Sequence, residues 1–291
     1  MHNRICRPAL LAAWLGLAAA VPAAGQPAVA KPPGPEPGRG EPAPASRELE
    51  RINWMELREW VPARITTVIV PFGTVEEHGV GPNGTDILAP LAIARDIAPR
   101  VNAMVAPPVP YGITGSLDAY PGGITIPEEA YRPYVRAVLA GLARNHFRNI
   151  ILINGHGGSQ SGVLTSLASE VGRELNVRTL VVNWWTYCTD VTLKVFGEDG
   201  GHAGENENAF VMAIDPALVH KERYSDDLAL ANPPSGTWSA YPHPAPIMLY
   251  REGQGYPKFD LAKAKQYYAA VNDKIAKLAI DVIKRWDAAG L

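Results

Sequence analysis

Cysteine is scarce in this chain of 291 residues, and that scarcity limits how the protein can be stabilised. The two cysteines are Cys6, in an apolar N-terminal segment, and Cys188. If the N-terminal segment is removed, Cys188 has no partner within the chain and an internal disulfide is excluded. The stability of the mature domain must then come from a hydrophobic core or from bound metal.

The sequence also lacks clusters of basic residues interleaved with aromatic ones. Its 27 Lys and Arg residues are balanced by 29 Asp and Glu residues, and the formal net charge is −2. Proteins that bind nucleic acid usually carry a basic patch or stripe. The composition therefore predicts no nucleic-acid partner.

The one long apolar run lies at the N-terminus. Arg4 and Arg7 precede an apolar stretch over residues 9–21, and small residues follow at 22–25. This order is typical of a secretory signal with a cleavage site near Ala24. The alternative is a permanent membrane anchor, but the run is short and has no stop-transfer flank. We expect residues 1–25 to be a signal peptide and the protein to be exported, either periplasmic or secreted, without a stable membrane span.

The segment after the signal is rich in Pro, Ala and Gly and has no periodic apolar face. Residues 26–46 are therefore expected to form an extended linker. Residues 47–291 remain for the folded part, a length that suits a single domain with a sizeable core.

Within that domain, short β-branched runs alternate with segments of helical periodicity. We expect strands at 65–70, 101–105, 149–153 and 177–182. We expect helices at 47–60, with Ser46 as a possible N-cap, and at 87–98, 127–146, 159–175, 205–214 and 261–286. Such alternation predicts an α/β fold with a mostly parallel central sheet and helices on both faces.

Three side chains that can bind metal follow the first expected strand: Glu76, His78 and Asp86. Two carboxylates and an imidazole suit Zn²⁺, Mn²⁺ or Fe²⁺. On an extended segment Glu76 and His78 point to the same side, while Glu77 faces away. Asp86 would bridge two ions, or it would instead cap the helix that begins near Ile87.

A second group follows the third expected strand, in the sequence Asn154-Gly155-His156-Gly157-Gly158. Its glycines allow close backbone approach and free His156 to point into a cleft at the carboxyl end of the strand. A phosphate-binding turn is the alternative, but the glycine spacing matches neither the dinucleotide nor the P-loop fingerprint.

A third group contains His202 and Glu207, on either side of Gly204 where a helix is expected to begin. An imidazole and a carboxylate at such a place can carry a proton and complete a metal site. The alternative for Glu207 is an acid placed in the first turn of a helix by the helix dipole.

Aromatic residues near these groups are candidates for substrate contact. Trp184 and Trp185 follow the fourth expected strand, where their faces can wall a flat polar molecule. Tyr120 lies in the glycine-bearing loop between residues 111 and 125, and we include it among the substrate-binding candidates. Packing in the core or at a subunit interface is the alternative for the tryptophans.

The motifs occur in an order that resembles the creatininase (creatinine amidohydrolase) family, over roughly residues 50 to 220. The residues that carry the resemblance are Ile69-Val70-Pro71-Phe72-Gly73-Thr74-Val75-Glu76-Glu77-His78-Gly79, Gly84-Thr85-Asp86, Tyr120-Pro121-Gly122-Gly123, Ile153 to Gly158, and His202 to Glu207.

The resemblance implies a three-layer α/β/α domain that binds two divalent ions, Zn, Mn or Fe, and opens amide bonds of small cyclic or formylated molecules. It also implies a homo-oligomer, with hexamers common in the family. By the same resemblance the metal ligands are Glu76, His78, Asp86, His156 and Glu207, with Asp86 bridging, and His202 is the catalytic proton carrier.

The chain departs from the family pattern at several places. Creatinine-cleaving members have Tyr-Glu where this chain has Gly157-Gly158, which argues against creatinine as the substrate. Asn208-Ala209 replaces the common Thr-Ser, and the stretch before Asp86 is shorter than usual. The altered stretch before Asp86 and the missing Thr-Ser pair leave open an exported binding protein that has lost turnover. The second alternative is another enzyme, a metal-dependent peptidase or lactonase.

Overall fold

The computed structural model describes residues 43–231, 237–244, 247–249 and 251–291. The expected signal peptide, residues 1–25, lies outside the described residues, as does the expected linker as far as residue 42.

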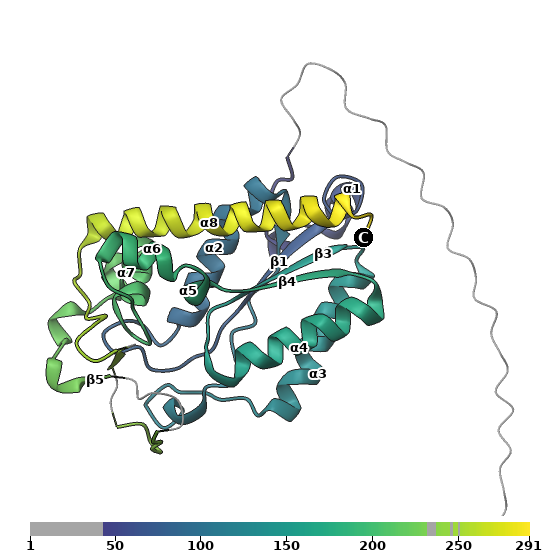
Figure 1. The fold of residues 1–291 in the computed structure, drawn as a ribbon. Helices are drawn as coiled ribbons and strands as arrows, with labels where there is room; N and C mark the ends of the chain where they lie inside the picture. The colour runs from purple at the N-terminus through teal and green to yellow at the C-terminus, as the bar shows by residue number, and fades with distance from the viewer. Residues whose placement is uncertain (1–42, 232–236, 245–246, 250) are drawn as a thin grey trace, which may run out of the picture. The chain divides into compact units, whose positions relative to one another are not determined.

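The centre of the domain is a four-stranded parallel sheet (Figure 1). In spatial order its strands are β2 (Ala103–Val105), β1 (Thr67–Phe72), β3 (Asn149–Asn154) and β4 (Arg178–Asn183). Every residue of β1 and β3 is buried, as expected for parallel strands that are covered on both faces. In the register, Phe72 pairs with Asn154 and Asn154 with Asn183, so these three strands end together.

Helices cover both faces of the sheet. One face carries α3 (Glu128–Arg144) and α4 (Gly158–Leu175), and the opposite face carries α2 (Thr85–Val101), α7 (Glu205–Ile214) and α8 (Leu261–Ala288) (Figure 1). The expected three-layer α/β/α arrangement with a parallel central sheet is confirmed.

Side chains that point alternately to the two faces of the sheet divide the apolar residues of each strand between two cores. Val68 and Leu152 belong to the core under α3 and α4, whereas Ile69 and Ile151 belong to the core under α2, α7 and α8. Successive residues of a strand point to opposite faces, so one continuous apolar run supplies both layers. Each such buried side chain contributes about 1.5 to 3 kcal/mol relative to an exposed one.

The remaining elements differ more from expectation. The single helix expected at 47–60 is divided into a short 3-10 helix, η1 (Leu49–Arg51), and α1 (Trp54–Trp60). The division occurs because the Asn53 side chain accepts hydrogen bonds from the amides of Met55 and Glu56 and so caps a new helix. Ser46 does not cap a long helix, and its hydroxyl accepts only the Glu48 amide.

Several short elements were not expected at all. They are α5 (Trp184–Tyr187), α6 (Thr189–Phe196), β5 (Ala229–Ala231), β6 (Ile247–Leu249) and four further 3-10 helices, η2 (Gly115–Leu117), η3 (Pro216–Leu218), η4 (Lys221–Arg223) and η5 (Asp226–Leu228). Each is too short to show a periodic apolar pattern in the sequence. Among the described helices, none combines the length and the apolar character that crossing a bilayer requires.

Cys188 provides a test of the packed core. The residue is fully buried, and burial raises the pKa of its thiol to about 12. Only about one thiol in ten thousand is then ionised at pH 8, and the thiolate is the reactive form. We expect a Cys6→Ser form of the protein to resist a disulfide reagent at pH 8 while folded and to react fully in denaturant. Rapid reaction of the native protein, absent in a Cys6→Ser/Cys188→Ser control, would contradict this packing.

Candidate metal centre

The candidate ligands lie at the carboxyl ends of the central strands. Glu76 and His78 follow β1, and His156 follows β3, which is the neighbour of β1 in the sheet. The chain crosses from β1 to β2 on one side and reaches β3 on the other, so the strand order reverses at β1. Ligand sites of open α/β sheets form at the carboxyl ends of strands at such a switch point.

Asp86 reaches the same point because two glycines let the backbone of α2 approach the strand ends. A Cβ atom on Gly73 would lie 2.3 Å from the main-chain oxygen of Asp86, and one on Gly155 would lie 2.0 Å from it. No side chain fits at either position while Asp86 stays in place. Asp86 is the second residue of α2 and its carboxylate faces the histidines, so it does not serve as the helix cap.

The Asp86 carboxylate joins two groups of ligand atoms. Its Oδ1 lies 3.0 Å from Nε2 of His78, and its Oδ2 lies 3.0 Å from Nδ1 of His156. Around it, Oε1 of Glu76 is 3.1 Å from His156 Nδ1, and Oε2 of Glu207 is 3.6 Å from His78 Nε2. The sets Glu76–Asp86–His156 and His78–Asp86–Glu207 can therefore each hold a divalent ion, with Asp86 common to both.

Main-chain carbonyl groups fix which nitrogen of each histidine faces the carboxylates. Nε2 of His156 lies 2.9 Å from the carbonyl oxygen of Ile113, and Nδ1 of His78 lies 3.3 Å from that of Glu76. A carbonyl oxygen only accepts, so these nitrogens carry the hydrogen. The other nitrogen of each ring is left to bind an ion, which is the usual arrangement of a metal-bound histidine.

The electrostatics of the chain alone also fit a cation site. Burial would lower the pKa of His156, but Asp86 and Glu76 raise it to about 10. The pKa of His78 is also raised despite burial, chiefly by Asp86. Burial raises the pKa of Glu207. Among the described residues, no well-directed hydrogen-bond donor reaches either oxygen of the fully buried Glu76. Buried carboxylates without donors are expected where cations supply the missing charge.

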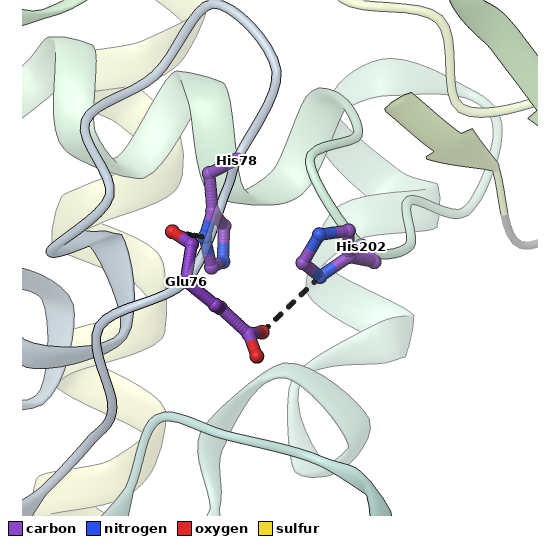
Figure 2. A group of neighbouring side chains, drawn as sticks. All are labelled: Glu76, His78 and His202. Atoms are coloured by element: carbon purple, nitrogen blue, oxygen red, sulfur yellow. Dashed lines mark hydrogen bonds and ion pairs between the residues drawn. The ribbon is translucent and has the colours of Figure 1, made fainter. Parts of the chain in front are cut away.

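His202 lies on the loop before α7 and faces the Glu76 carboxylate (Figure 2). Its Nδ1 is 3.6 Å from Oε1 of Glu76, and its ring centroid is 4.5 Å from that of His78. Glu207, in the first turn of α7, accepts the amide of Ala203 at 2.7 Å. The structure thus brings all six predicted residues together, the five proposed ligands and His202, and His202 is close enough to complete a third set with Glu76 and His78.

A pocket of about 450 Å³ opens above these residues. Trp185 lines it, as expected for a substrate contact. Trp184 does not line it: the ring is buried in the core, 4.9 Å from that of Phe210, so for this residue the alternative of core packing is correct. Tyr120 does not line the pocket either, and its hydroxyl donates to the carbonyl oxygen of His243 at 2.6 Å.

Part of the site was not foreseen from the sequence. Ile113 contributes through its main-chain oxygen, and Thr114 lines the pocket while its hydroxyl lies 2.7 Å from that of Thr74. A main-chain contact leaves no signature in residue type. The glycines of the loop over residues 111–125 were the available signal, since close backbone approach requires them.

The family model described as Creatininase, creatinine amidohydrolase, matches residues 50–279. The chain belongs to the creatininase family. The match extends well beyond the stretch that carries the motifs and includes most of α8. With the buried ligand set, family membership makes the chain a metal-dependent hydrolase of the creatininase type.

Relatives in this family carry different names. A 3-dehydro-scyllo-inosose hydrolase of Thermotoga maritima is 29% identical over 77% of this chain and 80% of its own length. The creatinine amidohydrolase of Pseudomonas putida is 26% identical over 68% of this chain and 84% of its own. A mycofactocin precursor peptide peptidase of Mycobacterium ulcerans is 28% identical over 57% of this chain and 65% of its own length.

Solved creatininase structures share the fold. The structure described as "Creatininase Mn" superposes with a TM-score of 0.69 at 23% identity, and covers 80% of this chain and 97% of its own. A mutant creatininase of Zn–Zn type gives 0.69 at 23% identity, with 80% and 96% covered. Manganese and zinc are both ions that a mixed carboxylate and imidazole set accepts.

Metal analysis tests the shared role of Asp86. We expect the purified protein to bind about two divalent ions per chain, His156→Ala to lose about one, and Asp86→Ala to lose both, since Asp86 belongs to both sets. Affinity should fall as the pH is lowered, because protons on His78 and His156 compete with the ions. Mass spectrometry of dialysed protein measures the content.

The matched control for these variants is His220→Ala, which removes an exposed histidine outside the cluster and should keep both ions. Full retention of metal in Asp86→Ala would show that the two sets do not share this carboxylate.

Proposed function

We propose that this protein hydrolyses a C–N bond of a small amide, cyclic amide or formamide, with His202 as the catalytic proton carrier and Glu76, His78, Asp86, His156 and Glu207 as metal ligands. The observation that carries the proposal is the orientation of the histidine rings. His78 and His156 each turn one fixed nitrogen toward the buried Asp86 carboxylate, which lines the pocket together with His156. Burying carboxylates beside oriented histidine rings is costly unless bound cations compensate the charge.

Divalent ions in a site of this kind supply an activated water and polarise a carbonyl group. The remaining work falls to the chain. Glu76, Asp86 and Glu207 would balance the ionic charge. Gly157 and Trp185 line the pocket side by side, since a Cβ on Gly157 would make an ordinary contact of 3.6 Å with the tryptophan ring. His202, whose Nδ1 faces the Glu76 carboxylate, would hand a proton to the departing nitrogen, which leaves poorly as an anion.

The pocket restricts the substrate class. Its volume of about 450 Å³ suits a small molecule. No described residue of its lining is Lys or Arg, and Asp199 lines it beside the carboxylates of the cluster. With the cluster carboxylates balanced by ions, Asp199 adds a negative charge and no Lys or Arg of the described lining would pair with a substrate carboxylate, so a substrate without a carboxylate is favoured.

Two alternatives are weighed against this function. The buried cluster opposes a binding protein that has lost turnover, because the five proposed ligands lie together with His202, the proposed proton carrier. A metal-dependent peptidase is favoured by the relatives named peptide peptidases, and identification of the products distinguishes it from an amidohydrolase.

The experiment that tests the proposal is a turnover screen with a neutral cyclic amide, an N-formyl amine, creatinine and a dipeptide, on metal-loaded protein. We expect turnover of one of the first two and none of creatinine. His202→Ala should lower kcat by about 10² to 10⁴ with metal content unchanged, because general acid catalysis contributes a factor of that size. Loss of metal in His202→Ala would make the residue a ligand, and unchanged turnover would remove it from the mechanism.

Export and assembly are proposed on separate grounds. The basic residues, apolar run and small residues of segment 1–25 support export to the periplasm or the medium. Membership of the creatininase family supports assembly into a homo-oligomer such as a hexamer, as the family resemblance implies.

The N-terminus of the mature protein tests export. We expect protein recovered outside the cytoplasm to begin between about residues 23 and 28, because the small residues near Ala24 form the cleavage site. Mass spectrometry of the intact chain decides it. Cytoplasmic protein that retains Met1 in a host with an active secretion system would overturn the prediction.

A further inference from the structure

Glu77 is a buried acid for which the proposed mechanism has no role. It lies between two proposed ligands, Glu76 and His78, and only 6% of its surface is exposed. One carboxylate oxygen, Oε2, accepts the amide of Gly79 at 3.2 Å. The other, Oε1, has no well-directed hydrogen-bond donor among the described residues. Burying a carboxylate is costly unless a partner or a function compensates.

That oxygen faces the ring of His202, whose Nε2 lies 3.3 Å from Oε1 of Glu77. The same nitrogen lies closer, at 2.9 Å, to the main-chain oxygen of Glu77. One residue therefore presents both a carbonyl and a carboxylate oxygen to a single ring nitrogen. Because neither group donates, Nε2 of His202 must carry a hydrogen.

This contact determines which atom of His202 faces the reaction. With Nε2 held against Glu77, the nitrogen that can gain or lose a proton is Nδ1. Figure 2 shows the ring of His202 directed at the Glu76 carboxylate, and Nδ1 is the atom 3.6 Å from it. The atom that exchanges protons is thus on the side of the metal centre and the pocket.

His202 differs from the other two histidines in what lies behind the ring. The outer nitrogens of His78 and His156 meet a carbonyl oxygen, from Glu76 and Ile113 respectively. Only for His202, among these three, is a carboxylate added to the carbonyl. A carbonyl alone suffices to orient a ligand, whereas a carboxylate also stabilises the positively charged ring that a proton carrier becomes.

The electrostatics agree with this difference. Burial and the neighbouring His78 would both lower the pKa of His202, but Glu77 and Glu76 raise it above its ordinary value. The sequence accounts for the placement, because side chains alternate along an extended segment. Glu76 and His78 point to the cluster of proposed ligands, whereas Glu77, between them, points to Nε2 of His202.

We propose that Glu77 is a positioning residue for His202, which holds the Nε2 hydrogen and directs Nδ1 at the metal centre and at the leaving nitrogen of the substrate. This proposal rests on the proposed function of His202 as proton carrier. It assigns to Glu77 a role through the ring and no contact with the substrate, since Glu77 does not line the pocket.

The test uses Glu77→Gln, which preserves the shape of the side chain and an oxygen for the Gly79 amide but removes the charge. We expect kcat of the metal-loaded full chain to fall about 10- to 100-fold, with KM and metal content unchanged, the size typical of removing an outer hydrogen-bond partner. Glu77→Asp should recover part of the loss. The matched control is Glu205→Gln. Glu205 is also a buried acid, but it lies on α7 outside the groups that could hold an ion, and this variant should keep wild-type kcat.

A double variant separates positioning from a structural effect. If Glu77 acts only through His202, Glu77→Gln should cause no further loss of kcat in the His202→Ala background. Equal losses in both backgrounds, or an unchanged kcat in the single variant, would overturn the proposal.

A crystal structure of the zinc-loaded full chain tests the contact without any activity measurement. We expect the Glu77 carboxylate within hydrogen-bond distance of His202 Nε2, and a Glu77 carboxylate turned toward an ion or toward solvent would overturn the proposal. If the wild-type chain turns over none of the screened substrates, the proposed function fails while this structural result still decides the contact.

Discussion

The site depends on one close approach, that of the first turn of α2 to the ends of β1 and β3. The main-chain oxygen of Asp86 occupies the space in which a side chain on Gly73 or Gly155 would lie. This contact brings the Asp86 carboxylate between His78, which follows β1, and His156, which follows β3. A displacement of Asp86 by even the width of a methyl group would separate the two ligand sets. Two glycines at strand ends therefore matter as much to the metal centre as the ligands themselves.

The orientation of the rings depends in turn on the main chain. The carbonyl oxygens of Glu76, Glu77 and Ile113 each face one histidine nitrogen, and the main chain cannot rotate away as a side chain can. The chain itself therefore orients the three rings, by contacts that do not involve an ion. Pre-ordering reduces the entropy lost on binding, which is one reason that metal sites are commonly supported by such outer contacts.

Much of this arrangement could be predicted from the sequence, and the exceptions have physical reasons. The strands β1 and β3 were evident as continuous β-branched runs, but their ends were misplaced by one or two residues because a fully buried strand has no polar alternation to mark its limits. The cluster of Glu76, His78, Asp86, His156 and Glu207 was predictable because carboxyl ends of parallel strands meet at one edge.

The division of the first helix at Asn53 was missed because a capping residue within an apolar pattern resembles an exposed helical position. Trp184 and Trp185 could not be told apart by type, since the turn of α5 sends one ring to the core and the other to the pocket.

The sequence Glu76-Glu77-His78 has a consequence that residue types alone do not convey. In an extended segment the first and third side chains face one side and the second faces the other. Here the first side faces the cluster of proposed ligands. On the other side lies the loop before α7, and Glu77 contacts Nε2 of His202 on that loop. Three consecutive residues thus contact both the cluster of proposed ligands and the proposed proton carrier, His202. A backbone shift in this segment would therefore disturb two proposed ligands, Glu76 and His78, and the contacts that hold the His202 ring at the same time.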